Sequence, residues 1–179
     1  DIRNGLAERI IPEIANKGNF ITVVSPLGRP QLKRWLTGRS IRLLMEQISN
    51  PILYVPQACL PVKKLLVTVG GLGYGEAAEN IAVQIARAND AEVTLLYVVP
   101  PTDLDYPSTR GVQEHVDNLA ETDTLPGRSL RKALEIAQGA GLNAKAKARQ
   151  GNIVEEILAE IKVENYDRVC MGSAYSANT

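Results

Sequence analysis

A strand, a glycine turn and a basic helix are expected between residues 19 and 40, and together they could hold an anion. Residues 20–24 are apolar except for one threonine and mostly β-branched, which is typical of a buried strand. Gly28 lies in the turn, and apolar residues then recur at helical spacing. Backbone N–H groups at the start of such a helix favour an anion. Positive charge crowds the same run, at Arg29, Lys33, Arg34, Arg39 and Arg42.

The glycine spacing of this stretch resembles that of the universal stress protein family. Nucleotide-binding members of that family carry the pattern Gly-x2-Gly-x9-Gly-Ser/Thr after their fourth strand. Gly28 and Gly38 fit the second and third glycines, while Ser25 replaces the first. Arg39 stands at the Ser/Thr position, and a serine follows one place later. The resemblance implies a nucleotide or anion site, altered in its chemistry, at Gly28, Arg29, Gly38, Arg39 and Ser40.

A second strand–turn–helix begins after a proline-containing linker. The apolar run 64–69 predicts a buried strand, residues 70–75 a glycine-rich turn and residues 76–88 a helix. A further apolar strand is expected at 91–99, so the order is a βαβ unit with parallel strands and a right-handed crossover. The turn does not match a dinucleotide fingerprint, because Glu76 stands where the third glycine is needed. These glycines are instead expected to allow a tight turn.

The rest of the chain continues the alternation of helices and strands. Residues 102–125 hold six acidic residues and one arginine, and they predict a mobile acidic loop or a poorly packed helix. A helix is expected at 126–138, and alternating apolar and polar residues predict a half-exposed strand at 142–148. Another helix follows from residue 151, and a strand at 166–173 runs into a glycine turn.

An internal repeat sets the expected domain organisation. A shift of 147 residues lays Ile10, Ile11 and Ile14 on Ile157, Leu158 and Ile161. Residues 1–60 are therefore expected to be the C-terminal part of a first stress-protein domain. Residues 61–179 are expected to be most of a second, lacking its last helix and strand. The strands expected at 20–25 and 52–55 could compete with strand 167–172 for the place beside the second unit's first strand. Alternatively, each half could pair with its counterpart in another copy, or with residues outside this sequence.

The resemblance covers nearly all of the chain and implies its fold class. We expect an α/β fold with an open, mostly parallel five-stranded sheet and helices on both faces. The implied strand order is 3-2-1-4-5, as in the adenine-nucleotide alpha-hydrolases.

The family also implies where a nucleotide would bind in the second unit. Its ATP-binding members contact the base with an aspartate at the end of the first strand, where this chain has Gly70. Gly172 keeps the first glycine of the distal motif, but Tyr175 stands at the second. We therefore expect ATP or AMP to bind weakly or not at all. The remaining candidates for this site are Gly70, Gly71, Val98, Val99, Met171, Gly172 and Ser173.

Other classes of function find little support in the residues. The one histidine, His115, lies in the acidic stretch, and there is no Ser/His/Asp set, metal-ligand cluster or nucleophile elbow, so no enzyme is expected. Net charge is zero and aromatic residues are 4%, which does not favour nucleic acid. No apolar run reaches 18 residues, so no membrane span is expected. Cys59 and Cys170 are expected to be reduced thiols in a cytoplasmic protein.

Two classes of function remain. One is a small-molecule binding domain that takes an adenine nucleotide and changes its dimer or partner contacts. The other is a nucleotide-independent regulatory domain attached to a larger protein. Family members dimerise through their terminal strands, so self-association is expected through the apolar edge strand Ile52–Val55.

Overall fold

The computed structural model forms two compact units, each described by itself. One unit contains residues 1–58 and 173–179, and the other contains residues 59–172. The structure describes residues 2–25, 42–57, 60–70, 75–101 and 116–172.

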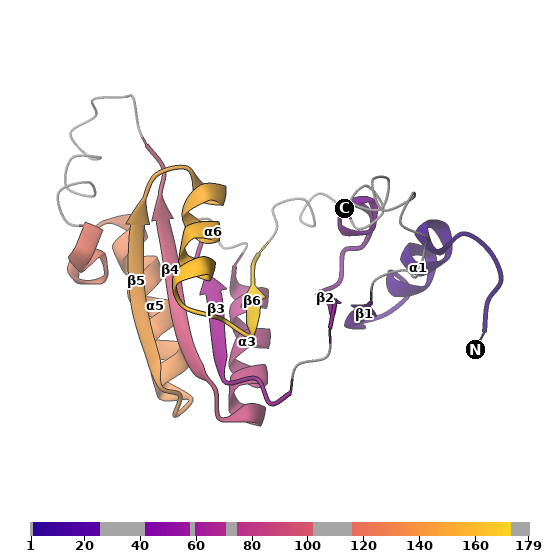
Figure 1. The fold of residues 1–179 in the computed structure, drawn as a ribbon, viewed down its shortest axis with the longest axis horizontal. Coiled ribbons are helices and arrows are strands. Elements are labelled where there is room, and N and C mark those ends of the chain that lie inside the picture. The colour runs from indigo at the N-terminus through magenta and orange to yellow at the C-terminus, as the bar shows by residue number, and fades with distance from the viewer. Residues whose placement is uncertain (1, 26–41, 58–59, 71–74, 102–115, 173–179) are drawn as a thin grey trace. The chain divides into compact units, whose positions relative to one another are not determined.

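The first unit, called unit 1, contains a helix, a pair of parallel strands and a short helical segment (Figure 1). Helix α1 (Ala7–Ala15) continues through Pro12, which is buried. Strands β1 (Thr22–Val24) and β2 (Ile52–Tyr54) pair in parallel. A helical segment at 42–47 lies between them in the sequence. The buried cluster that joins these elements contains Ala15, Val24, Leu44 and Ile48, with Ile11 and Ile52 packed against it.

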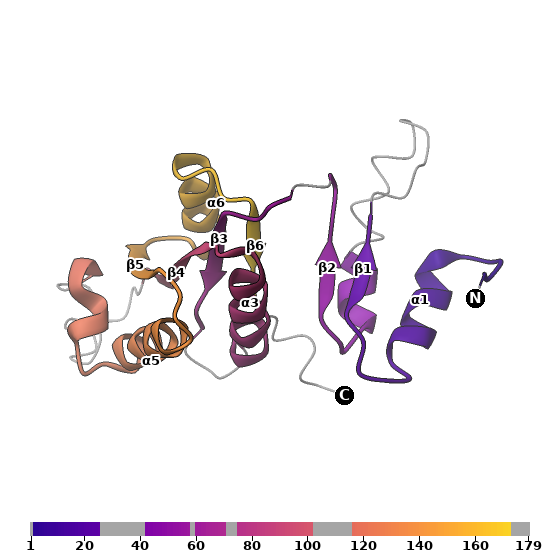
Figure 2. The same cartoon turned by 90° about the horizontal axis from the view of Figure 1, so that it is seen from below.

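The second unit, called unit 2, is a four-stranded parallel sheet in the order β5-β4-β3-β6. Its strands are β3 (Lys64–Thr68), β4 (Glu92–Val99), β5 (Ala144–Gln150) and β6 (Arg168–Cys170). Its helices are α3 (Glu76–Asn89), α5 (Leu125–Gly139) and α6 (Ile153–Val163), with a 3₁₀ helix η2 (Val116–Glu121). Figure 2 shows α3 and α5 on one face of this sheet and α6 on the other.

Alternation along the central strands explains why helices cover both faces. Leu65 and Val67 of β3 join a cluster with Ala82 and Ala86 of α3, and the cluster also includes Leu130 of α5. The intervening residues point to the opposite face because strand side chains alternate. Leu66 and Leu96 lie there, and they are 0% and 1% exposed. Strands buried on both faces are typical of parallel sheets.

The described part of the acidic stretch packs better than its composition predicts. Leu119 of η2 is 1% exposed and belongs to the core of unit 2, so a poorly packed segment is wrong at this point. Close packing of η2 on α5 depends on Gly127, where a Cβ atom would overlap the carbonyl of Leu119 and the Thr122 hydroxyl. His115 lies outside the described residues.

The expected fold class is confirmed, since parallel strands are flanked by helices on both faces. If β3 is counted as the first strand, unit 2 has the order third, second, first, fourth. β6, and not β1 or β2, occupies the place beside β3, so the competition expected between these strands does not occur. Strand β5 begins and ends two residues later than expected. Among the described residues, no helix has the length and apolar character that crossing a membrane requires.

Candidate functional site

The strands of unit 2 bring most of the described candidate residues to one end of the sheet, the end at which the strands finish. Because β3, β4 and β6 are parallel, their carboxyl ends all lie there. The sheet grows from β3 through β4 to β5, and the chain then returns to place β6 on the other side of β3. Ligands of open α/β sheets bind at such a switch point, outside the carboxyl ends of the strands.

Four of the predicted residues lie at or just after the carboxyl ends of these strands. Gly70 follows β3 and is exposed, and Met171 and Gly172 follow β6 and are also exposed. Val98 is half-buried at the end of β4. Val99 is different, because its side chain belongs to the core under α3 and α5. The other predicted residues lie outside the described part of the chain, namely Gly28, Arg29, Gly38, Arg39, Ser40, Gly71 and Ser173.

The start of α3 brings negative charge close to this end of the sheet. An ideal Cβ on Gly75, the residue before α3, would lie 3.5 Å from the backbone nitrogen of Gly70 and 2.8 Å from a carboxylate oxygen of Glu79. Burial raises the pKa of Glu79, and the nearby charge of Glu76 raises it further. Carboxylates stabilise a helix N-terminus. They also repel a phosphate there, so this helix start is poorly suited to hold one.

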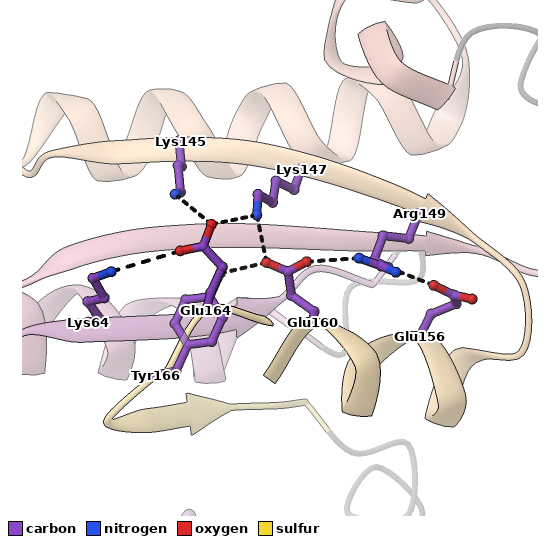
Figure 3. Close-up of polar contacts among 8 residues, drawn as sticks. All are labelled: Lys64, Lys145, Lys147, Arg149, Glu156, Glu160, Glu164 and Tyr166. Atoms are coloured by element: carbon purple, nitrogen blue, oxygen red, sulfur yellow. Dashed lines mark hydrogen bonds and ion pairs between the residues drawn. The ribbon is translucent and has the colours of Figure 1, made fainter. Parts of the chain in front are cut away.

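A ladder of opposite charges joins β5 to α6 beneath the same sheet (Figure 3). The cations occupy alternate positions of β5, and the glutamates are spaced four residues apart along α6 and its end. Two strand residues advance by about 6.6 Å and four helical residues by about 6.0 Å, so the two series stay in step. We call this set the charge ladder; its members are Lys145, Lys147, Arg149, Glu156, Glu160 and Glu164.

Glu160 is the centre of the charge ladder and is 1% exposed. Its carboxylate accepts hydrogen bonds from Lys147 Nζ at 2.8 Å and from Arg149 Nη1 at 3.1 Å. The Tyr166 hydroxyl donates a third hydrogen bond at 2.8 Å. These three hydrogen bonds compensate for the removal of the carboxylate from water. A buried charge without such partners would be strongly destabilising.

The ionisation of the ladder follows from these contacts. Burial acts to raise the pKa of Glu160, but the hydrogen bonds from Lys147 and Tyr166 outweigh it and hold this pKa below its usual value. The hydrogen bond to Glu160 raises the pKa of Lys147. Burial, with the hydrogen bond to Glu160, raises the pKa of Tyr166 to about 12. Both shifts favour the charged forms of Glu160 and Lys147 near neutral pH.

The charge ladder, together with hydrogen bonds to Asp167, fixes the position of β6. The carboxyl end of β6 forms one side of the candidate site. Tyr166 lies in the turn between α6 and β6 and is tied to Glu160. The next residue, Asp167, accepts hydrogen bonds from the backbone N–H groups of Lys63 and Lys64 at 2.7 and 2.9 Å. Together these contacts fix where β6 begins beside β3, and hence where Met171 and Gly172 emerge.

The charge ladder is not among the features predicted from the sequence, although a signal for it is present. Apolar periodicity over residues 153–161 predicts the helix, but it does not predict that the face with the glutamates packs on the sheet. Cations stand at alternate positions of 145–149, and glutamates stand four apart at 156, 160 and 164. The cations repeat with the period of a strand, and the glutamates of the next element repeat with the period of a helix. Read together, these two patterns would have predicted the contact between β5 and α6.

Comparison with known proteins places the chain in a family. Residues 61–176 match the model of the universal stress protein family. A universal stress protein from Archaeoglobus fulgidus has the same fold, with a TM-score of 0.63 at 16% identity over 96% of this chain and 55% of that one. A family protein from Arabidopsis thaliana with AMP bound has a TM-score of 0.46 at 17% identity, covering 62% of this chain and 76% of that one.

A curated relative is similar over a shorter region. The multiphosphoryl transfer protein of Haemophilus influenzae is 30% identical over 93 residues, which is 52% of this chain and 18% of the relative. The chain thus matches less than a fifth of that protein's length. The family model, in contrast, spans well over half of this chain and most of unit 2. On this match, the chain belongs to the universal stress protein family.

Proposed function

We propose that this chain is a regulatory domain region of the stress-protein type, without catalytic chemistry, in which binding of ATP or AMP at unit 2 is weakened or lost. The observation that carries the proposal is Gly70. It follows β3 at the switch point, exposed, and offers no carboxylate where the family resemblance implies an aspartate. A charge-assisted hydrogen bond of that kind contributes about 1.5–3 kcal/mol.

The charges of the neighbouring helix support the same conclusion. Glu76 and Glu79 in the first turn of α3 already supply negative charge close to Gly70. Glu76 is paired with Lys132 at 2.9 Å, so this lysine is engaged rather than available to a phosphate. An anionic ligand at this end of the sheet therefore meets repulsion with little compensating positive charge from α3.

The test restores the carboxylate. No atom of the described residues lies within 4 Å of a Cβ atom placed at Gly70, so Gly70→Asp clashes with none of them. We expect calorimetry to show millimolar or undetectable binding of AMP and ATP to the wild type, and affinity about 10- to 100-fold higher for Gly70→Asp. Gly70→Asn, which lacks the charge, is the matched control and should gain less. Micromolar binding to the wild type would refute the proposal.

The alternative function is an ATP- or AMP-binding stress protein that signals through dimer or partner contacts. One observation favours it: Val98 at the end of β4, and Met171 and Gly172 just after β6, keep partly or fully exposed surface at the carboxyl ends of their strands. The anion candidates between residues 28 and 40 would serve a first site. Nucleotide-dependent change in molecular mass, measured by light scattering, distinguishes this function from the first.

Partners and domain organisation belong to the same proposal. Residues 1–60 would be the end of one stress-protein domain and residues 61–179 most of the next. Self-association would use the edge of β2, where Tyr54 is 43% exposed. A larger protein carrying this region is consistent with the partial match to a much longer multiphosphoryl transfer protein.

A further inference from the structure

Glu79 turns its carboxylate back over the start of α3, toward the end of β3. A Cβ atom placed on Gly75 would lie 2.8 Å from a carboxylate oxygen of Glu79 and 3.5 Å from the backbone nitrogen of Gly70. Gly75 is buried and has no side chain, so it leaves open the space beside which this carboxylate lies. The Glu79 carboxylate is therefore close to Gly70, at the switch point of unit 2.

This carboxylate is half-buried, and within the described ranges no donor is hydrogen-bonded or ion-paired to it. Glu76 in the same helical turn differs, because it is paired with Lys132 at 2.9 Å. Burial and the charge of Glu76 raise the pKa of Glu79. Among the residues that the structure describes, no buried side-chain oxygen lacks a partner, so the oxygens of Glu79 must still reach solvent. Glu79 thus offers an open acceptor at the candidate site.

The chemistry of a carboxylate decides which ligands it favours. An ionised carboxylate accepts hydrogen bonds and donates none, so it binds the hydroxyl and amino groups of a ligand. It repels a phosphate group that comes near it. Residues 69–75, which join β3 to α3, contain no lysine or arginine that could offset this charge. Lys132 is already engaged by Glu76.

We propose that Glu79 makes the switch point of unit 2 selective for uncharged ligands that carry hydroxyl and amino groups, the nucleoside class, over their phosphorylated forms. This inference rests on the proposed function and extends it. The binding of AMP is weakened by the carboxylate that Gly70 lacks, and it is weakened further by the carboxylate that Glu79 supplies. A nucleoside offers the donors that this carboxylate needs and brings no negative charge.

Adenosine and AMP are the matched probes, because they differ only in the phosphate group. NMR titration of the full chain follows the amide signals of Gly70 and Gly172, which report on the switch point and not on the anion candidates of residues 28–40. We expect adenosine to bind at least about fivefold more tightly than AMP. Like charges near a protein surface repel each other enough to change an affinity by this factor.

The isosteric variant Glu79→Gln tests the assignment to this residue. It should weaken adenosine binding about three- to tenfold, because a neutral amide oxygen is a poorer acceptor than a carboxylate. The ratio of the adenosine affinity to the AMP affinity should fall to about one or below. Asp90→Asn is the matched control, since it removes the same charge at the other end of α3, about 16 Å away along the axis and beyond the screening length of physiological salt. Its ratio should stay within about twofold of the wild type.

Three results would overturn the inference. They are AMP binding as tightly as adenosine, an affinity ratio that Glu79→Gln leaves unchanged, and no binding of either probe at millimolar concentration. The last result leaves the proposed function intact, because nucleotide binding is then lost altogether. Micromolar binding of AMP at these amide signals would overturn the proposed function as well. The comparison of the two probes on the wild type decides the matter even if the variant is unstable.

Discussion

Replacing Glu160 by glutamine is the most direct test of the charge ladder. The substitution keeps the size of the side chain and removes only its charge. Glu160 accepts hydrogen bonds from Lys147 and Arg149, and its side chain is 2% exposed. The amide oxygen of glutamine can keep the bond from the Tyr166 hydroxyl, but the amide NH₂ group must then face a cation. The expected effect is therefore a loss of stability in unit 2.

The magnitude follows from the exposure of the partners. A buried hydrogen bond to a charged group contributes about 1.5–3 kcal/mol, and two are weakened here. Lys147 and Arg149 are 31% and 33% exposed, so water recovers part of this loss. Each also keeps a second carboxylate, at 3.1 Å in Glu164 and 2.6 Å in Glu156. We therefore expect Glu160→Gln to lower the free energy of unfolding by about 2–3 kcal/mol, less than the roughly 3–6 kcal/mol that two such bonds would contribute without this compensation.

Urea unfolding followed by circular dichroism measures this difference. The slope of free energy against urea should not change, because the folded shape is kept. Glu135→Gln on the exposed side of α5 is the control and should stay within about 0.5 kcal/mol of the wild type. If Glu160→Gln matches that control, the buried carboxylate contributes no net stability and our reasoning about the ladder is refuted.

Three other substitutions or conditions probe the same unit. The pKa values of Glu160 and Glu164 are lowered in the folded state, so their contribution to stability is present above the usual glutamate pKa and is lost as pH falls through the folded values. The urea concentration at the unfolding midpoint should therefore decrease when the pH falls below about 4. This decrease should be less steep in Glu160→Gln. Gly127→Ala should cost about 1–3 kcal/mol in the same assay, because its Cβ would overlap the backbone oxygens of Leu119 and Thr122, whereas Gly139→Ala, with no atom of the described residues within 4 Å, should not destabilise. Asn152→Ala removes the side chain that caps Val154 and Glu155, with an expected loss of about 1 kcal/mol that Asn152→Asp should avoid.

The central sheet was predictable because its signals are local. The strands β3 and β4 are largely apolar runs, and a glycine-rich stretch of sequence and the helix α3 separate them. With this pattern, a crossover between two parallel strands is the expected connection from β3 to β4. The edge strand β5 was less well predicted, because its alternating alanine and cationic residues fit a strand without fixing its ends.

The orientation of α6 could not be predicted from apolar periodicity alone. Aliphatic residues at helical spacing normally face a core, but here the sheet offers cations at three positions of β5. A carboxylate at position 160 pairs with those cations better than an aliphatic side chain could, because unpaired buried ends of lysine and arginine are costly. The helix therefore turns its glutamates inward. The candidate site was predictable only as a location, from the rule that ligands meet strand ends at a switch point.

The two edges of the unit 2 sheet differ in a way that bears on self-association and on further strands. The β5 edge carries Lys145, Lys147 and Arg149, and charged residues on an edge strand oppose pairing with another strand. The β6 edge is three residues long and includes Val169 and Cys170, where burial raises the pKa of the thiol. In the described part of the chain no strand covers that edge. A fifth strand would therefore join beside β6, the side that the order 3-2-1-4-5 requires. The cations of β5 thus have two effects at once: they protect one edge of the sheet, and they draw the carboxylate of Glu160 inward.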